Sequence, residues 1–329
     1  MGNKLAAFRY WSGVFKYRLT HPEAYRKLWE ILDEALDITK FHSMRLGTYR
    51  QYKPRPPQRE MFPGRRPTSG ECLSIAIVTP SYNQRQFVGQ TIDSILGQNY
   101  PNLKYAVMDG GSQDGSQAAI GRRASELSVY VSEPDGGQSD AIAKGFARVS
   151  GEIMAYLNSD DLLMPGALAY ADKYFREHPE VDVIYGHRLI VDEQGLQIGR
   201  WVLPPHYDRD VEFFDFIPQE TMFWRRRIWK KAGGINPNFQ FAMDWDLILR
   251  FIKAGAKFVR VPYYLAYFRA HESQKSQLVF GTRGQKEIDS LLAGVHEAGV
   301  DKKEFMRRHR KYRRKAVACA VLLSMGIRV

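Results

Sequence analysis

The segment between residues 73 and 157 alternates short apolar runs with stretches of helical spacing. The apolar runs have the length of buried strands and span residues 73–80, 103–108, 127–131 and 153–157. Apolar residues recur at helical intervals between these runs, most clearly in residues 86–96 and 139–149. Strand–helix alternation of this kind predicts an α/β fold with a mostly parallel central sheet and helices on both faces.

Three of the apolar runs end in polar or glycine-rich loops, at residues 80–83, 109–116 and 158–161. The loop Asp109-Gly-Gly-Ser-Gln-Asp-Gly-Ser116 has a composition typical of a turn. In open α/β sheets, ligands bind outside the carboxyl ends of the strands. We therefore expect the three loops to converge on one cleft.

Two adjacent carboxylates, Asp160 and Asp161, follow the strand predicted at residues 153–157. Neighbouring carboxylates repel each other and stay ionised at low cost only beside a cation. Hard oxygen ligands of this type suit magnesium or manganese, ions that usually bridge to substrate phosphates. The alternative is a solvated loop in which Asp161 caps the next helix.

Net charge and cysteine content narrow the class of protein. The 329 residues carry a formal net charge of +12, with dense basic stretches at residues 45–66 and 302–315. Such an excess indicates an anionic partner: a nucleotide, an acidic membrane surface or nucleic acid. Cys72 and Cys319 cannot make a disulfide framework, which favours a reducing compartment. We expect neither a membrane span, which needs ~18–20 apolar residues, nor a secretory signal.

Six motifs in a fixed order resemble those of a known family. They are Ile77-Val-Thr-Pro-Ser-Tyr-Asn83, Asp109-Gly-Gly-Ser-Gln-Asp-Gly-Ser116, Asp135-Gly-Gly-Gln-Ser-Asp-Ala-Ile-Ala-Lys-Gly145, Leu157-Asn-Ser-Asp-Asp161, Met243-Asp-Trp-Asp246 and Tyr267-Phe-Arg-Ala-His271. Together they resemble an inverting family 2 glycosyltransferase of the GT-A fold, which is a nucleotide-diphospho-sugar transferase. One such motif alone would be weak, but six in order and spacing are specific. The resemblance covers roughly residues 72–275.

The resemblance implies a binding site for a nucleotide-sugar donor, with a UDP-sugar as the implied donor. Asp109 stands where a family carboxylate accepts a hydrogen bond from uracil, and Arg269 is placed to pair with phosphate. The implied donor-binding residues are Pro80, Ser81, Tyr82, Asn83, Asp109, Asp135, Gln138, Lys144, Asn158, Ser159, Asp160 and Arg269.

Three of the implied donor residues raise alternatives. Asp109 also suits an Asx-turn at the end of a strand. Lys144 also suits an exposed lysine on a helix. Asn158 stands where the family usually has a carboxylate, so this chain has one negative charge fewer at that point. A change in the contact with the donor ribose is left open as an alternative.

Asp244 is the expected general base. Inverting transfer needs a carboxylate that takes the proton of the acceptor hydroxyl as it attacks the anomeric carbon. The family often has Glu-Asp at this point, and Met243 replaces the Glu here. Asp246 competes for the role unless a helix beginning at Asp244 turns its side chain elsewhere. The alternative for Asp244 itself is a helix N-cap.

The resemblance also implies a divalent cation, Mn²⁺ or Mg²⁺, held by Asp160, Asp161 and His271. His271 resembles a late histidine of the family that reaches back to the metal or the diphosphate, and an imidazole suits such a mixed site. The alternative is a surface histidine that follows a strand. Gln219 and Glu220 precede an apolar strand where the family often places acceptor-side groups.

The chain is expected to have three parts. Residues 1–71 form a helical extension with a Pro-rich linker or arm, residues 72–280 the GT-A domain, and residues 281–329 C-terminal helices with a basic tail. The basic, amphipathic flanks suit either packing on the domain or contact with an anionic membrane surface. We expect a cytoplasmic protein, peripheral at the inner face of the membrane.

The expected reaction moves the sugar to a saccharide or lipid-linked acceptor during synthesis of a cell-surface polysaccharide or glycoconjugate. One alternative is a nucleotide-binding scaffold without turnover. Another is a basic nucleic-acid-binding protein, but the basic runs lie outside the motifs and no recognition motif is present, so no nucleic-acid partner is expected. A dehydrogenase is a poor fit, because no GxGxxG follows the first strand.

Overall fold

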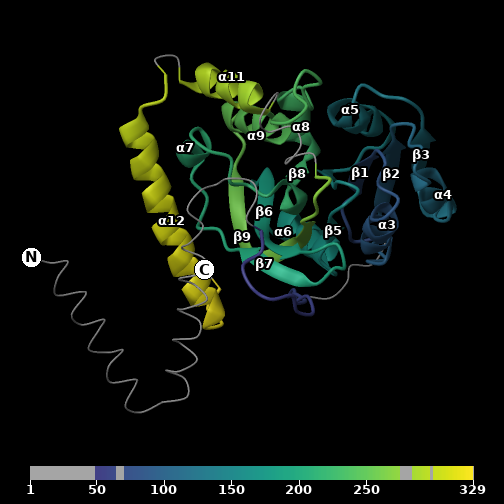
Figure 1. Cartoon of the computed structure of the whole chain (residues 1–329), viewed down its shortest axis with the longest axis horizontal. Coiled ribbons are helices and arrows are strands. Elements are labelled where there is room, and N and C mark those ends of the chain that lie inside the picture. Colours follow the sequence, from purple (N-terminus) through teal and green to yellow (C-terminus); the bar gives the residue numbers. More distant parts are fainter. Residues whose placement is uncertain (1–48, 64–69, 275–283, 297–298, 329) are drawn as a thin grey trace, which may run out of the picture.

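The computed structural model describes residues 49–63, 70–274, 284–296 and 299–328, which build an α/β fold around one mixed sheet (Figure 1). The strand order is β3-β2-β1-β4-β8-β6-β9-β5, and β7 pairs with β6. The strands are β1 Ile75–Ser81, β2 Leu103–Asp109, β3 Val129–Ser132, β4 Ile153–Tyr156, β5 Leu162–Leu163, β6 Val183–Val191, β7 Gln197–Trp201, β8 Phe223–Arg225 and β9 Phe258–Arg269. The helices expected in residues 1–45 lie outside the described residues.

The strands β1 to β4 form the parallel half of the sheet, as the sequence predicts. β1 pairs in parallel with β2 on one side and β4 on the other, and β2 pairs in parallel with β3. The crossovers that parallel pairing requires are α3 (Val88–Leu96), α4 (Ser116–Gly121) and α5 (Gln138–Arg148). The carboxyl ends of these strands therefore meet at one edge of the sheet.

Helix α5 lies directly against β1. Its buried residues include Ala141, Ile142 and Gly145, all on one face. A side chain at Gly145 would collide with Val78 of β1, so glycine at this position allows the close approach of helix and strand. Every residue of β1 is buried, which explains its continuous apolar sequence.

The other half of the sheet mixes both directions. β8 is antiparallel to β4 and to β6, β5 is antiparallel to β9, and β7 is antiparallel to β6. β6 and β9 run parallel to each other. The parallel character expected for the whole sheet thus holds in the first half and for the β6–β9 pair.

The strand boundaries in this half differ from the sequence prediction. The apolar runs at residues 181–185 and 188–191 predict two strands, but β6 is one strand with an irregular register opposite β9 around His187. A side chain at Gly186 would come within 2.5 Å of the Tyr263 carbonyl oxygen, so the glycine lets β9 pass close by. Strand β7 was not predicted, because the sequence Gln197–Trp201 lacks an apolar run although most of it is buried.

The remaining helices are α6 Ala167–Glu177, α7 Asp208–Val211, α8 Arg226–Lys231, α9 Met243–Lys253, α11 Gln285–Val295 and α12 Lys302–Ser324, with short 3₁₀ turns at 124–126 and 219–221. The basic tail is one long helix, α12, which lies along the side of the molecule opposite to α4 (Figure 1). The Asp301 carboxylate caps it by accepting from the Lys303 backbone N–H at 2.9 Å. Within the described ranges, no helix combines the length and the apolar character needed to cross a bilayer.

Residues 49–63 run along the sheet edge as an extended arm. The backbone N–H of Gln51 donates to the Ile198 carbonyl at 2.7 Å, and Arg55 bridges to Gln197 of β7. Tyr49 is buried at this contact. The described part of the Pro-rich stretch therefore covers the outer edge of β7.

Candidate active site

One cavity of about 1170 Å³ opens at the carboxyl ends of β1 and β4 and continues between β7, α9 and α12. All three predicted loops contribute to it, since Pro80, Gly110 and Asn158 line its wall. Of the predicted site residues, the cavity wall contains Pro80, Ser81, Tyr82, Asp135, Gln138, Asn158, Ser159, Asp160, Asp161 and Asp244. The structure places Asn83, Asp109, Lys144, Arg269 and His271 outside this wall.

Asn83 and Asp109 shape the loops behind the cavity wall. Asn83 has a left-handed backbone (φ 52°), and its side-chain oxygen accepts from the Gln113 N–H at 3.0 Å, which ties the first loop to the second. The Asp109 carboxylate accepts from the Ser112 N–H and hydroxyl at 3.1 and 2.5 Å and from the Ser132 hydroxyl at 2.6 Å. This is the turn-forming arrangement raised as the alternative for Asp109, and its contact with a nucleotide base stays a prediction.

The start of α5 supplies the next part of the wall. The Asp135 carboxylate accepts from the Gly137 N–H at 2.7 Å, and burial raises the pKa of Asp135. The Gln138 amide donates to the side-chain oxygen of Asn158 at 2.6 Å. Lys144 instead pairs with Asp140 at 2.8 Å on the outer face of α5, as expected for its alternative role as a helix-surface lysine.

Asp160 and Asp161 have different surroundings although they are neighbours. Asp160 is partly exposed, and its Oδ2 lies 3.0 Å from Nε2 of His271. Asp161 is only 2% exposed, and its Oδ1 accepts from the Arg269 backbone N–H at 3.0 Å. Burial raises the pKa of Asp161 well above its usual range, and the nearby Asp160 and Glu220 carboxylates raise it further.

Arg269 stabilises the acidic loop, residues 158–161, from behind the two carboxylates. Its guanidinium donates to the backbone oxygens of Asp160 and Glu193, at 2.9 and 3.0 Å, and to the Gln90 side chain at 2.8 Å. The side chain is fully buried. Arg269 therefore fixes the acidic loop, and direct pairing with a donor phosphate stays a prediction.

The residues at this end of the cavity fit a divalent cation only with help from a ligand. Asp160 offers a carboxylate and His271 an imidazole, whose Nδ1 lies 2.8 Å from the Ser273 hydroxyl. In the part of the chain that the structure describes, no three His, Cys, Asp or Glu side chains are grouped to hold a metal by themselves. Oxygen and imidazole donors suit Mg²⁺ or Mn²⁺, and donor phosphates would have to complete the shell.

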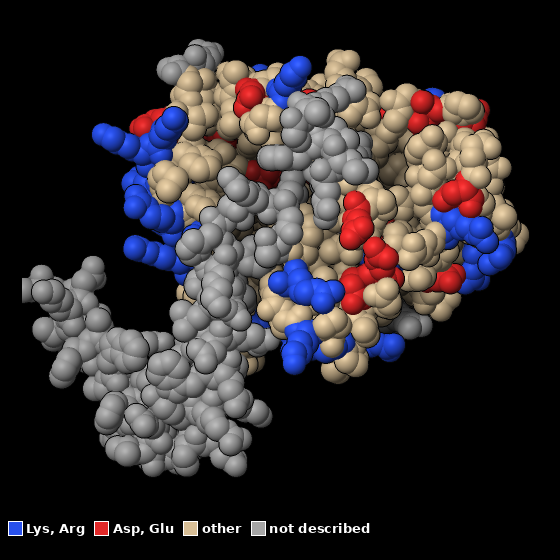
Figure 2. Space-filling view, in the orientation of Figure 1, with Lys and Arg blue, Asp and Glu red and all other residues tan. Residues whose placement is uncertain are grey.

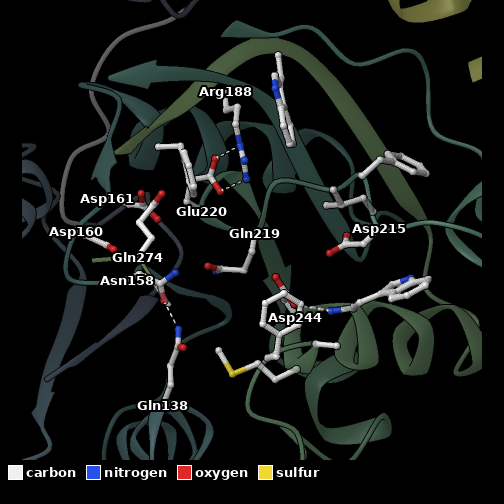
Figure 3. A pocket seen from close by; sticks show the side chains of 18 of the residues that line it. Gln138, Asn158, Asp160, Asp161, Arg188, Asp215, Gln219, Glu220, Asp244 and Gln274 are labelled. Carbon is white, nitrogen blue, oxygen red and sulfur yellow. Dashed lines mark hydrogen bonds and ion pairs between the residues drawn. The ribbon is translucent and has the colours of Figure 1, made fainter. Parts of the chain in front are cut away.

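Asp244 lies in the first turn of α9 and faces the cavity (Figure 3). Asp246 is not part of the cavity wall. The Asp244 Oδ1 accepts from the Trp245 backbone N–H at 2.9 Å. Asp246 is held by Arg250, whose guanidinium donates to Oδ2 at 2.9 and 2.6 Å. Because α9 turns Asp246 into this ion pair, Asp244 is the one of the two that a substrate can reach.

Sequence reasoning missed a second carboxylate, Asp215, which lines the cavity near Asp244 (Figure 3). Its side chain is accessible from the cavity, although protein atoms surround it closely enough to desolvate its charge. Burial and the Asp244 charge therefore raise the pKa of Asp215 well above its usual range. The only sequence signal was an acidic residue within the apolar run Phe213-Phe-Asp-Phe-Ile217.

A buried ion pair between Arg188 and Glu220 also faces the cavity and was not predicted. The guanidinium donates to both Glu220 oxygens at 2.7 and 2.8 Å, a bidentate geometry that gives strong hydrogen bonds. The Arg188 guanidinium also lies over the rings of Trp201 and Phe268, at 4.3 and 4.4 Å from their centroids. The pair joins β6 to the 3₁₀ turn that precedes β8.

A comparison with known protein families identifies the family to which this chain belongs. The family described as "Glycosyl transferase family 2" matches residues 76–245, which is more than half of the chain. The chain belongs to glycosyl transferase family 2. The match includes the motifs up to Trp245, whereas Arg269 and His271 lie beyond it.

Curated relatives of this family 2 glycosyltransferase include other transferases. An uncharacterised glycosyltransferase of Mycobacterium tuberculosis is 28% identical over 182 residues, which cover 54% of this chain and 68% of the relative. The chondroitin synthase of Pasteurella multocida is 25% identical over 183 residues, which cover 55% of this chain and 19% of that protein. The chain is therefore a glycosyltransferase, as expected.

Solved structures confirm the GT-A fold of this family 2 glycosyltransferase. Staphylococcus aureus TarS 1–349 in complex with UDP-GlcNAc matches with a TM-score of 0.58 and 15% identity over 73% of each chain. The mannosyltransferase PcManGT of Pyrobaculum calidifontis, in complex with GDP-Man and Mn²⁺, matches with a TM-score of 0.52 and 17% identity over 92% of this chain and 84% of the other. At these identities the likeness concerns the fold alone.

Proposed function

We propose that this protein transfers a sugar from a UDP-sugar to a hydroxyl of a saccharide or lipid-linked acceptor, with inversion at the anomeric carbon. One observation carries the proposal: a single cavity contains the acidic donor end, Asp160, and a separate accessible carboxylate, Asp244. Inverting transfer needs these two ends, one for the leaving diphosphate and one for the attacking hydroxyl. The TarS complex with UDP-GlcNAc supports uridine as the donor base.

Asp244 acts as the general base in this proposal. Its carboxylate takes the proton of the acceptor hydroxyl as that oxygen forms a bond to the anomeric carbon. The bond from the anomeric carbon to the diphosphate oxygen breaks on the opposite face, and the nucleoside diphosphate leaves with the bonding electrons. The position of Asp244 in the first turn of α9, with a hydrogen bond from the Trp245 N–H, holds the carboxylate in place.

Asp160 and His271 would hold the divalent cation at the donor end, with Asp161 beside them. The bound cation supplies neutralisation of the charge that builds on the leaving diphosphate. Arg269 holds the acidic loop through the backbone oxygen of Asp160 and the carboxylate of Asp161. The complex of PcManGT with both GDP-Man and Mn²⁺ supports a metal-assisted transfer.

The acceptor belongs to the synthesis of a cell-surface polysaccharide or glycoconjugate in this proposal. The chondroitin synthase among the relatives supports a polysaccharide product.

The proposal also includes docking of the protein on an anionic membrane surface, and the exposed basic face of α12 supports this part of it. Figure 2 shows Lys and Arg side chains gathered along α12, and its basic residues include Arg307, Arg310, Lys311, Arg314 and Lys315.

A thermal-shift panel of UDP-sugars, GDP-mannose and bare nucleoside diphosphates, each with and without manganese, tests the donor assignment. We expect one UDP-sugar to raise the melting temperature, and manganese to increase that shift because the phosphates complete the cation site. The Asp160→Asn variant should keep the fold and lose the manganese-dependent part. A folded sample that responds to no nucleotide would contradict the proposal and favour a charge-driven binder.

A non-catalytic nucleotide-binding scaffold predicts a different result. Such a protein would show the donor shift but no transfer or donor hydrolysis. Radiolabelled donor with a mixture of saccharide and lipid-linked acceptors separates the two functions, since only the enzyme moves the label.

A further inference from the structure

Several buried polar atoms in the cavity wall make no hydrogen bond with any described residue, and two of them are the side-chain oxygen of Gln219 and the hydroxyl of Tyr156. Gln219 is 5% exposed and Tyr156 is 1% exposed. Buried polar groups are nearly always hydrogen-bonded, and an unpaired one is costly. An unpaired donor and acceptor in one cavity wall therefore point to a polar ligand.

The orientation of Gln219 is fixed by its other amide atom. Nε2 donates to the Tyr156 backbone oxygen at 2.7 Å. Only the NH₂ end of an amide can donate to a carbonyl, so this bond assigns Oε1 to the opposite side. Figure 3 shows the Gln219 amide directed into the cavity, toward the side where Asn158 lies.

Tyr156 supplies the complementary group. Burial raises the pKa of Tyr156 well above its usual value, and the carboxylates of Asp244, Asp215 and Glu220 raise it further. The side chain is thus a neutral phenol, which can donate a hydrogen bond. The same interactions show that Tyr156 lies among the carboxylates at the base end of the cavity.

The position of Tyr156 and Gln219 in the cavity indicates which part of a substrate they would contact. Asn158, which is fixed by Gln138, lies at the end of the cavity proposed to hold the donor diphosphate. Asp244, the proposed base, lies at the other end. Figure 3 shows Gln219 between Asn158 and Asp244. In a transfer of the proposed kind, the sugar that moves must lie between the diphosphate and the base. Hydroxyls of that sugar ring are both donors and acceptors, which matches the two unpaired atoms.

We propose that Tyr156 and Gln219 form a subsite that selects the transferred sugar, in which the Tyr156 hydroxyl donates to one ring hydroxyl and Gln219 Oε1 accepts from a ring hydroxyl. This inference rests on the proposed glycosyl transfer. The two residues are specificity determinants and take no part in proton transfer. Their ligand is the pyranose of the donor, since the proposed function assigns the nucleotide to the loops after β1, β2 and β4.

Tyr156→Phe provides the sharpest test, because it removes an oxygen that has no hydrogen-bond partner among the described residues. We expect unchanged or increased thermal stability, unchanged affinity for bare UDP, and an affinity for the UDP-sugar that is roughly 3- to 10-fold lower. Calorimetric titrations with UDP, UDP-glucose and UDP-N-acetylglucosamine measure these quantities. Equal affinity of wild type and variant for every sugar nucleotide would overturn the inference.

Tyr105→Phe is the matched control. Its hydroxyl is also buried, but it is paired with the Thr79 hydroxyl at 2.9 Å inside the core, away from the cavity. This variant should lose thermal stability and keep the wild-type preference for sugar nucleotide over UDP. If both tyrosine variants change sugar affinity equally, the effect of Tyr156 is structural.

A second measurement uses donors that each lack one ring hydroxyl. Wild type should discriminate against the donor that lacks the hydroxyl bound by Tyr156, and Tyr156→Phe should bind that donor and the complete one equally. Gln219→Met should remove discrimination at a different hydroxyl. A wild-type protein that binds no sugar nucleotide would refute the proposed function, whereas binding with unaltered discrimination in both variants would refute only this subsite.

Discussion

At the residue scale, two aspartates separated by one position have unrelated environments. Asp244 faces the cavity, whereas Asp246 Oδ2 accepts two hydrogen bonds from the Arg250 guanidinium. The sequence pattern alone left both as candidates for the base. The helical rotation between them, which the structure supplies, places Asp244 in the cavity wall and Asp246 in an ion pair.

Asp244→Asn should abolish transfer without loss of donor affinity. The amide keeps the shape of the side chain but cannot take the acceptor proton, so kcat should fall by about 10²- to 10⁴-fold. Asp246→Asn is the control: it should lower the free energy of unfolding by about 1.5–3 kcal/mol and leave kcat nearly unchanged, since it weakens only the Arg250 pair. Steady-state kinetics, donor titration and urea unfolding measure these effects. Loss of donor binding in Asp244→Asn would give Asp244 a structural role instead.

Asp215→Asn should make the free energy of unfolding fall less as the pH rises. Burial and the Asp244 charge raise the pKa of Asp215, so the folded protein holds this side chain in its neutral form. The stability that this contributes is present at low pH and is lost as the pH rises through the raised pKa, whereas asparagine stays neutral throughout. Urea unfolding of wild type and variant at a series of pH values measures the difference. The same pH dependence in both proteins would contradict the raised pKa of Asp215.

The predictable part of the site consists of residues inside short, contiguous motifs. Asp160, Asn158 and Asp244 each stood out because adjacent residues carried the pattern. Asp215 and the Arg188–Glu220 pair did not, because they meet through tertiary packing of segments without a local signature. Burial that leaves a polar atom unpaired, as at Gln219, likewise cannot be read from local sequence.

At the scale of elements, the sequence predicts strands best where both faces are covered. β1 and β4 are continuous apolar runs, and their positions follow directly from the pattern. β7 buries polar side chains: the Gln197 amide is paired with the arm, where it accepts from the Gln58 N–H at 2.9 Å. A strand whose polar groups are satisfied by a distant segment has no periodic signal of its own, so it escaped prediction.

Helix α12 should bind anionic vesicles through its exposed basic face. Lys311, Arg314 and Lys315 are exposed, and each basic residue near an anionic surface contributes about 1 kcal/mol. Replacing these three residues by glutamate should weaken binding to phosphatidylserine-containing vesicles by at least about 100-fold. Vesicle co-sedimentation measures the effect.

A control with the same change in net charge distinguishes a docking face from general attraction. Lys104, Lys231 and Lys253 are exposed elsewhere on the molecule, and their replacement by glutamate should have a much smaller effect. Equal loss in both triple variants would mean that only net charge matters. Salt-dependent binding to random oligonucleotides, stronger than to vesicles, would favour the nucleic-acid alternative.

At the scale of the whole molecule, one buried glutamate joins segments from distant parts of the chain. Glu60 in the arm accepts from the Arg328 guanidinium at 2.6 Å and from the Tyr264 N–H of β9 at 3.1 Å. Arg328 also donates to the Pro262 carbonyl at 2.9 Å. Glu60 thus holds together the arm, the strand β9 and the segment after α12. We propose that the arm (residues 49–63), the C-terminal segment and the glycosyltransferase domain between them unfold as one unit.

Glu60→Gln should lower the free energy of unfolding by about 1.5–3 kcal/mol. The neutral amide keeps the size of the side chain but loses a charge-assisted bond to Arg328, in a position that is only 9% exposed. Urea unfolding followed by fluorescence and circular dichroism measures the change and shows whether both signals move together. Glu177→Gln, on an exposed helix position, should change it by less than about 0.5 kcal/mol. Separate transitions would indicate independent domains.

The Glu60 contact also sets an order of events during synthesis. Its partner Arg328 follows 268 positions later, so the ribosome must synthesise all the residues between them before this ion pair can form. Contacts of such long sequence separation form late, because a large loop must close first. Until then the arm is held to β7 by its own hydrogen bonds, such as those between Arg55 and Gln197, while the Glu60 carboxylate still lacks its charged partner.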